Sequence, residues 1–286
     1  MVSRVKVESL SRRTFLAATA MTPLAALGQS KGSIPVGLEL YSVRDELKAD
    51  LAGTLKNVAD DGYQCVEFFA PYHAWTADKA KDVRKTLDHL RLRCYSTHNG
   101  LDAFSDAQIG HTIELNHNLG AKYVILASAG NPKTLDGWKQ VADKLNHASE
   151  RLGSEGLEPG YHNHQTEFMP IDGVRPMEIL ARNTNHKIVL QLDVGTCVEA
   201  GSDPVAWIKQ NPGRIKCIHC KDWSAEQGYK VLFGEGSAPW KAIFAAAESV
   251  GGVEYYLVEQ EGSRFPPFKT AKLCLEAFRK IHGQAA

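Results

Sequence analysis

The stretch Lys216-Cys-Ile-His219-Cys-Lys221-Asp222 places a histidine, a lysine and an aspartate at the end of a short apolar run. Three other runs end in a similar way: Pro159-Gly-Tyr-His162-Asn-His164, Val189-Leu-Gln-Leu-Asp193 and Tyr255-Tyr-Leu-Val-Glu259. Apolar runs of this length, bounded by polar residues, are typical of buried strands. Four predicted strands therefore each end in a histidine or a carboxylate, and both the fold and the site follow from this repeated ending.

Short apolar runs alternate with amphipathic stretches along the rest of the chain. The sequence predicts eight strands, over residues 36–41, 64–69, 93–98, 123–127, 157–164, 187–194, 215–221 and 255–260. It predicts helices over 51–60, 76–90, 106–119, 134–152, 177–182, 204–210, 240–250 and 269–281. Strict alternation favours parallel strands joined by right-handed crossovers. Eight such units in about 250 residues indicate an α/β fold of the (β/α)8 TIM barrel type. The alternative, a doubly wound open sheet, would carry a G-x-G-x-x-G phosphate turn after an early strand, and the sequence has none.

The first thirty residues differ from the rest of the chain. Ser11-Arg12-Arg13-Thr14-Phe15-Leu16 opens a modest apolar stretch that ends in small residues. This pattern predicts a twin-arginine-type signal peptide over residues 1–30, with the barrel domain over 31–286. The twin-arginine export machinery is then a partner, and the expected location is periplasmic or otherwise exported. No apolar run after residue 30 is long enough to span a bilayer.

Charge and cysteine usage narrow the function classes. The formal net charge is zero, so nothing favours binding to nucleic acid or to an anionic membrane surface. The six cysteines are scattered and do not form a disulfide framework. Cys217 and Cys220 form a C-x-x-C within a predicted strand, so their side chains should point to opposite faces as small buried groups.

The strand ends predict a metal centre. In a parallel barrel, active-site residues come from the carboxyl ends of the strands, and side-chain alternation aims His162, Asp193, His219 and Glu259 into one mouth. A single buried histidine or aspartate is more often a hydrogen-bonded core residue, but four at matching strand ends are costly to bury unless a cation neutralises them. We therefore predict that these four residues bind a divalent metal. Nitrogen and oxygen ligands suit Mn²⁺, Zn²⁺, Co²⁺ or Fe²⁺ better than Ca²⁺.

Further polar residues near the strand ends complete the predicted site. We expect proton transfer to involve Glu259 together with His98, His164 and Lys221. Candidate substrate-binding residues are Glu67, Glu167 and Asp222. For all of these except Glu259, the alternative is a solvated loop residue or a structural ion pair.

Several segments resemble the sugar phosphate isomerase/epimerase family of xylose isomerase-like TIM barrels. They are Tyr161-His-Asn-His164, Leu192-Asp-Val-Gly195, His219-Cys-Lys-Asp222 and Val258-Glu-Gln260. The resemblance implies a metal centre of Glu, Asp, His and Glu from strands five to eight. The last three correspond to Asp193, His219 and Glu259, whereas His162 stands where the first glutamate is expected. Either His162 binds the metal as a neutral imidazole, which we favour, or it lies beside a weaker centre.

The resemblance implies a metal-dependent isomerase or epimerase that abstracts a proton next to a metal-bound carbonyl or hydroxyl. Because His162 replaces a glutamate, one-base isomerisation or β-elimination fits as well as a symmetric two-glutamate epimerisation. The alternatives are a lyase of the inosose-dehydratase or keto-glycoside type and a non-catalytic periplasmic sugar-binding protein. A nuclease would need a basic face. The expected export and the lack of an Arg/Lys cluster favour a free sugar, keto-sugar or polyol over a sugar phosphate, and the sequence is compatible with an oligomer.

Overall fold

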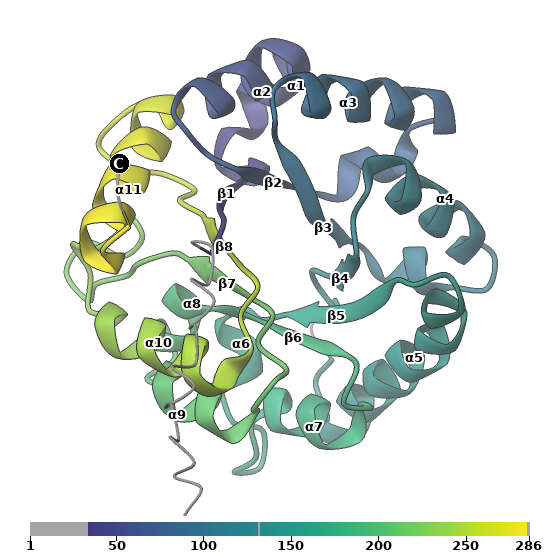
Figure 1. The fold of residues 1–286 in the computed structure, drawn as a ribbon. Helices are drawn as coiled ribbons and strands as arrows, with labels where there is room; N and C mark the ends of the chain where they lie inside the picture. The colour runs from purple at the N-terminus through teal and green to yellow at the C-terminus, as the bar shows by residue number, and fades with distance from the viewer. Residues whose placement is uncertain (1–33, 131, 285–286) are drawn as a thin grey trace, which may run out of the picture. The chain divides into compact units, whose positions relative to one another are not determined.

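The computed structural model describes residues 34–130 and 132–284. Eight parallel strands pair in chain order, and β1 pairs with β8 to close the barrel (Figure 1). The predicted (β/α)8 TIM barrel is therefore confirmed. The predicted signal segment, residues 1–30, lies outside the described residues. The strands are β1 (Val36–Glu39), β2 (Cys65–Phe68), β3 (Arg93–Asn99), β4 (Tyr123–Leu126), β5 (Glu158–His162), β6 (Val189–Asp193), β7 (Cys217–Cys220) and β8 (Tyr255–Val258).

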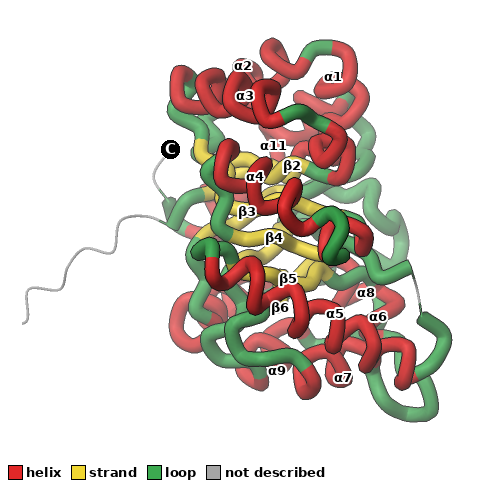
Figure 2. Tube along the Cα trace, turned by 90° about the vertical axis from the view of Figure 1, so that its right-hand side faces the viewer, coloured by secondary structure: helices red, strands yellow, loops and turns green. Residues whose placement is uncertain are grey.

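Helices surround the barrel, and a side view shows them on both sides of the strands (Figure 2). The long ones match the predicted ranges to within a few residues: α2 (Leu51–Asp60), α3 (Ala77–His89), α4 (Ile109–Leu119), α5 (Leu135–Ser154), α7 (Pro176–Asn183), α9 (Pro204–Gln210), α10 (Trp240–Ala246) and α11 (Pro267–His282). Shorter elements that were not predicted are α1 (Arg44–Ala49), α6 (Gln165–Phe168), α8 (Val194–Glu199) and the 3-10 turns η1 (Leu40–Val43), η2 (Ala70–Ala74) and η3 (Leu101–Phe104). Most of them are too short to show helical periodicity. The π-helical turn η4 (Ala247–Gly251) continues α10 and falls almost wholly within the helix predicted over 240–250.

Two separate apolar layers pack against the strands. The layer inside the barrel consists of Cys65, Tyr123, Ile125, Val189, Cys217, Tyr255 and Leu257. The larger layer, between strands and helices, contains the alternate residues, such as Leu190, Ile218 and Tyr256. Cys217 thus lies inside and Cys220 outside, as predicted, and all six cysteines are free and buried.

Two glycines allow neighbouring strands to pack closely inside the barrel, below the polar cluster. A Cβ on Gly160 would lie 2.4 Å from the Cδ1 atom of Ile125, and a Cβ on Gly37 would lie 2.4 Å from the carbonyl oxygen of Cys65. Neither position has room for a side chain. The barrel interior is therefore tightly packed at these two positions.

No helix within the described part of the chain is both long and apolar enough to cross a membrane.

Candidate metal centre

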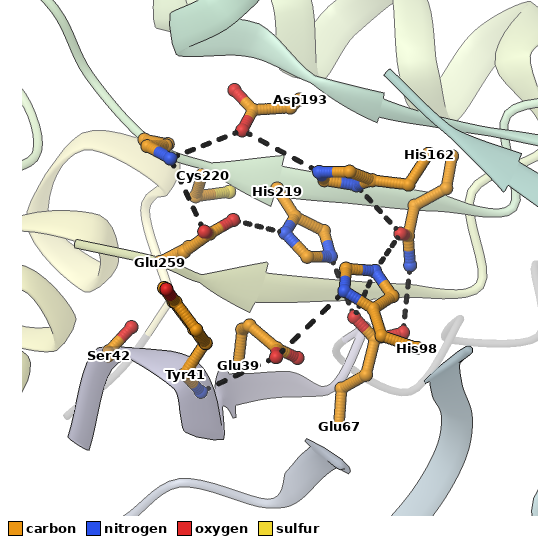
Figure 3. Close-up of polar contacts among 12 residues, drawn as sticks. Glu39, Tyr41, Ser42, Glu67, His98, His162, Asp193, His219, Cys220 and Glu259 are labelled. Carbon is orange, nitrogen blue, oxygen red and sulfur yellow. Dashed lines mark hydrogen bonds and ion pairs between the residues drawn. The ribbon is translucent and has the colours of Figure 1, made fainter. Parts of the chain in front are cut away.

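The four predicted metal ligands converge at the carboxyl ends of β5 to β8 (Figure 3). One ligand atom each of His162, Asp193 and Glu259 lies within 4.8 Å of the others, and the same holds for His98, His162 and His219. The Nδ1 atom of His219 lies 2.6 Å from a Glu259 oxygen, and the Nε2 atom of His162 lies 4.0 Å from the Oδ2 atom of Asp193. The structure brings the four side chains together, and their binding of a metal stays a prediction.

The chemistry of Asp193 fits a bound cation. Its carboxylate is fully buried, and its Oδ1 atom accepts the backbone N–H of Thr196 at 2.9 Å, which caps α8. Its Oδ2 atom accepts no hydrogen bond among the described residues and lies 3.7 Å from the Lys221 ammonium. A buried carboxylate oxygen without a donor is costly unless a cation or proton satisfies it. The set of two imidazoles and two carboxylates is one that Zn²⁺, Mn²⁺ or Fe²⁺ accepts.

His162 is held as a neutral ring with one nitrogen directed at Asp193. Its Nδ1 atom lies 2.9 Å from the Oε1 atom of Gln191, and the Gln191 amide donates to Glu67 at 2.9 Å. Oε1 of Gln191 is therefore the acceptor, and Nδ1 of His162 carries the proton. Burial and the imidazoles of His219 and His98 hold the pKa of His162 well below its usual value. The Nε2 lone pair is then free for a metal. This favours the interpretation in which His162 binds the metal as a neutral imidazole.

His219 lies between two carboxylates. Its Nε2 atom is 2.9 Å from Glu67, on the side opposite Glu259. Burial opposes a charged ring, but the hydrogen bonds to Glu259 and Glu67 raise the pKa of His219 to about 10. Glu67 is buried, yet the nearby His98 and His219 lower its pKa to about 2. A carboxylate of this kind behind a metal-binding imidazole orients the ring and fixes its tautomer.

Lys221 is buried beside the same carboxylates. Its Nζ atom lies 3.3 Å from Glu259, and it also pairs with Glu261. Burial disfavours the ammonium, but Glu259 and Asp193 raise the pKa of Lys221 well above its ordinary value. A permanently charged lysine offsets part of the negative charge of the site.

Two residues of the cluster were missed. Glu39 ends β1, is 1% exposed, and lies 4.0 Å from the Nδ1 atom of His98. Gln191 lies on the inward face of β6 and bridges His98, His162 and Glu67. Glu39 was missed because the first strand was predicted to run on to residue 41, whereas β1 ends at Glu39. Gln191 shares a face with Asp193, so alternation already pointed to it.

A cavity of about 310 Å³ opens above the cluster. Three of the four predicted proton-transfer residues, His98, His164 and Glu259, line it, together with His162 and Glu39. His164 is half-buried, and its ring centroid lies 5.1 Å from that of His162. These positions are suited to contact with a substrate, although the assigned roles stay predictions.

The three predicted substrate-binding carboxylates do not line this cavity. Glu67 lies beneath the histidines and is wholly buried. Glu167 accepts hydrogen bonds from the Tyr161 hydroxyl and the His164 backbone N–H at the start of α6. Asp222 accepts the backbone N–H groups of the loop after β7. Their contacts give them supporting positions, and direct binding of a substrate by any of them stays a prediction.

Comparison with known proteins agrees with the barrel fold. The family model of the xylose isomerase-like TIM barrel matches residues 55–281. The chain belongs to this family. Its structure is similar to that of a sugar phosphate isomerase/epimerase from Parabacteroides distasonis, with 26% identity and a TM-score of 0.74 over 91% of this chain and 98% of that one.

Two further proteins are similar to this chain. An inosose dehydratase from Geobacillus thermodenitrificans is 23% identical over 202 residues, which cover 58% of this chain and 67% of that protein. The chain spans between 59% and 67% of the length of the first curated relatives it matches. A structure of the IolI protein with a bound zinc atom shares the fold, with 15% identity and a TM-score of 0.67 over 86% of this chain and 97% of that one.

Proposed function

We propose that this protein is a metal-dependent lyase that acts on a free keto-sugar or keto-glycoside. A base removes the proton from the carbon next to the ketone. The C–O bond at the following carbon then breaks, and its electron pair leaves with the oxygen, which takes up a proton. The products are an unsaturated ketone and water or an alcohol. His162, Asp193, His219 and Glu259 would hold the metal, which when bound would polarise the substrate carbonyl.

The observation that carries the proposal is the state of His162. A symmetric epimerisation needs a second base on the opposite face of the carbon. The family resemblance implies that glutamate at the position of His162, whose Nδ1 proton is donated to Gln191 and whose Nε2 atom faces Asp193. With Nε2 bound to the proposed metal, neither nitrogen would be free to exchange a proton with carbon. One-base removal followed by loss of a leaving group needs no such partner.

The cavity wall supplies groups for both proton transfers. Glu259 is a buried carboxylate whose pKa is well below its usual value, because Lys221 and His219 outweigh the effect of burial. We assign Glu259 as the base that accepts the proton removed from carbon. The His164 imidazole is half-buried in the same wall, and we assign it the return of a proton to the departing oxygen. Dehydratase activity in the curated relatives supports this direction.

The charge of the cavity favours an unphosphorylated substrate. Among the described residues that line it, Glu39, Glu259 and Glu261 are acidic, and none is an arginine or lysine. Such a wall repels a phosphate group. The export signal predicted over residues 1–30 also favours an unphosphorylated substrate. We propose that the enzyme works outside the cytoplasm.

A second candidate is an isomerase or epimerase of the same substrates. It is favoured by the similarity to the Parabacteroides protein, of which the chain covers 98%. In an isomerisation the abstracted proton returns to a neighbouring carbon, and in an epimerisation it returns to the opposite face of the same carbon. Neither reaction releases a group.

One experiment separates these functions. Metal-loaded protein is incubated in D₂O with 3-keto-glycosides and inososes, and the products are followed by NMR. The lyase releases alcohol or water and forms an unsaturated ketone. Isomerisation or epimerisation incorporates deuterium without any release and would refute the lyase proposal, and no change at all would indicate a binding protein. Glu259→Gln should abolish the reaction, whereas Glu114→Gln, on the exposed face of α4, should not.

A further inference from the structure

A second cavity, of about 550 Å³, lies beside the cavity of about 310 Å³ that opens above the histidine and carboxylate cluster, here called the catalytic cavity. It lies between α1 and η2, which follow β1 and β2 at the same end of the barrel. Phe69 lines both cavities. Tyr41, in the wall of the catalytic cavity, meets the Phe69 ring edge-on, with centroids 5.2 Å apart. The two cavities therefore share an aromatic wall.

The floor of this second cavity is aromatic and apolar. Phe68 and Tyr72 are almost wholly buried in it, and the half-buried Trp75 contacts both rings edge-on, with centroids 5.3 Å and 6.0 Å away. Leu47 and Leu51 complete it from the helix side. Among the described residues that line it, the charged ones all belong to α1, namely Arg44, Asp45 and Lys48.

An aromatic ring beside this cavity is unusually exposed to solvent. Tyr41 is 37% exposed, and among the described residues only two other large hydrophobic side chains are exposed to this degree. The Arg44 guanidinium lies 4.6 Å from the centre of the Tyr41 ring and donates to the Tyr41 carbonyl at 3.0 Å. The guanidinium of Arg44, which lines the second cavity, therefore packs on the ring of Tyr41, which lines the first.

We propose that this second cavity binds the aglycone of a glycoside, and that the aglycone is an aromatic group. The inference rests on the proposed function, because elimination from a keto-glycoside expels the group attached through the glycosidic oxygen. The polar cavity, with its carboxylates and imidazoles, suits the sugar ring. The aromatic cavity next to it suits a flat apolar leaving group, and an inosose or free sugar would leave it unused.

Binding can be measured without turnover. Phenyl β-D-glucopyranoside and methyl β-D-glucopyranoside carry no ketone and cannot be eliminated, so calorimetric titration into the full metal-loaded protein gives their Kd values. We expect the phenyl glucoside to bind at least about tenfold more tightly, the factor that corresponds to burying roughly half of a phenyl ring. Leu47→Asp, which brings a charge to the aromatic cavity, should reduce this preference to about twofold or less, as expected when a charge faces an apolar group.

Val250→Asp provides the matched control, since it makes the same kind of change at an exposed apolar residue of η4 and should leave the preference intact. Should Leu47→Asp not fold, Leu47→Gln keeps the size of the side chain and should lower the preference in the same direction. Equal Kd values for the two glucosides, a preference retained in both Leu47 variants, or tighter binding of cellobiose than of the phenyl glucoside would overturn the inference. Failure of the lyase reaction with the phenyl preference intact would refute the proposed function alone.

Discussion

The carboxylate of Asp222 holds the loop between β7 and α10, and its removal should be strongly destabilising. This fully buried side chain accepts four backbone N–H groups, from Trp223, Gly234, Gly236 and Ala238, at 2.9 to 3.3 Å. It also accepts the indole N–H of Trp240 at 2.8 Å. The loop approaches so closely that a Cβ on Gly236 would lie 2.1 Å from the Oδ1 atom.

The magnitude follows from these five donors. Asp222→Ala leaves all of them without their acceptor, and each buried unpaired donor costs about 1–3 kcal/mol. Water entering the space left by the carboxylate will satisfy some of them, so we expect a loss of about 4 kcal/mol in the free energy of unfolding. For a chain of this size, that corresponds to a fall in Tm of roughly 8–16 °C.

The assay is urea unfolding followed by circular dichroism, with Asp143→Ala as control. Asp143 is an exposed residue of α5, and its substitution should change stability by less than about 0.5 kcal/mol. The loop also carries Tyr229, whose ring lies 4.9 Å from the Lys221 ammonium, so turnover should fall with stability. An Asp222→Ala protein within about 0.5 kcal/mol of the unsubstituted chain would refute the reasoning, because five donors, among them the buried indole N–H of Trp240, cannot lose their acceptor at so low a cost.

Three other changes have defined outcomes. Asp193→Ala should weaken metal binding by at least about a hundredfold, measured by competition with a chelator, while the far-UV spectrum stays unchanged; metal bound as tightly as before would exclude Asp193 as a ligand. Arg214→Met should cost about 3 kcal/mol in urea unfolding, because this buried guanidinium donates to the carbonyls of Ile188 and Ala181 and to Thr184; an unchanged midpoint would show that these bonds contribute nothing. Gly160→Ala should lower Tm by several degrees, since the new methyl group would overlap Ile125, and a Tm equal to that of the original protein would contradict the packing described for the barrel interior.

The strand ends could be predicted because topology alone brings them together. In a closed parallel barrel, consecutive strands deliver their last inward residues to one rim, so alternation along each run was enough to place Asp193 and His219 side by side. Glu39 was missed for a physical reason. Apolar residues continue through Leu40, so the predicted strand ran on to residue 41, whereas the chain turns into η1 directly after Glu39.

The supporting positions could not be predicted in this way. Asp222 follows a strand as the predicted ligands do, but its direction depends on a loop that folds back over the strand end. Two partners of Glu67, Gln191 and His219, come from β6 and β7, far along the chain. Such contacts depend on the distances between side chains, which a pattern of residue types does not contain. For the same reason the second cavity beside α1 was visible only in the structure, since α1 itself was not predicted.

The most direct test of the metal centre is anomalous X-ray diffraction from crystals of the protein grown with Mn²⁺ or Zn²⁺, with data collected on both sides of the absorption edge of the metal. The proposed centre predicts one strong peak about 2.0–2.3 Å from a ligand atom of each of His162, Asp193, His219 and Glu259. A peak bound elsewhere, or no peak among these side chains at saturating metal, would contradict it.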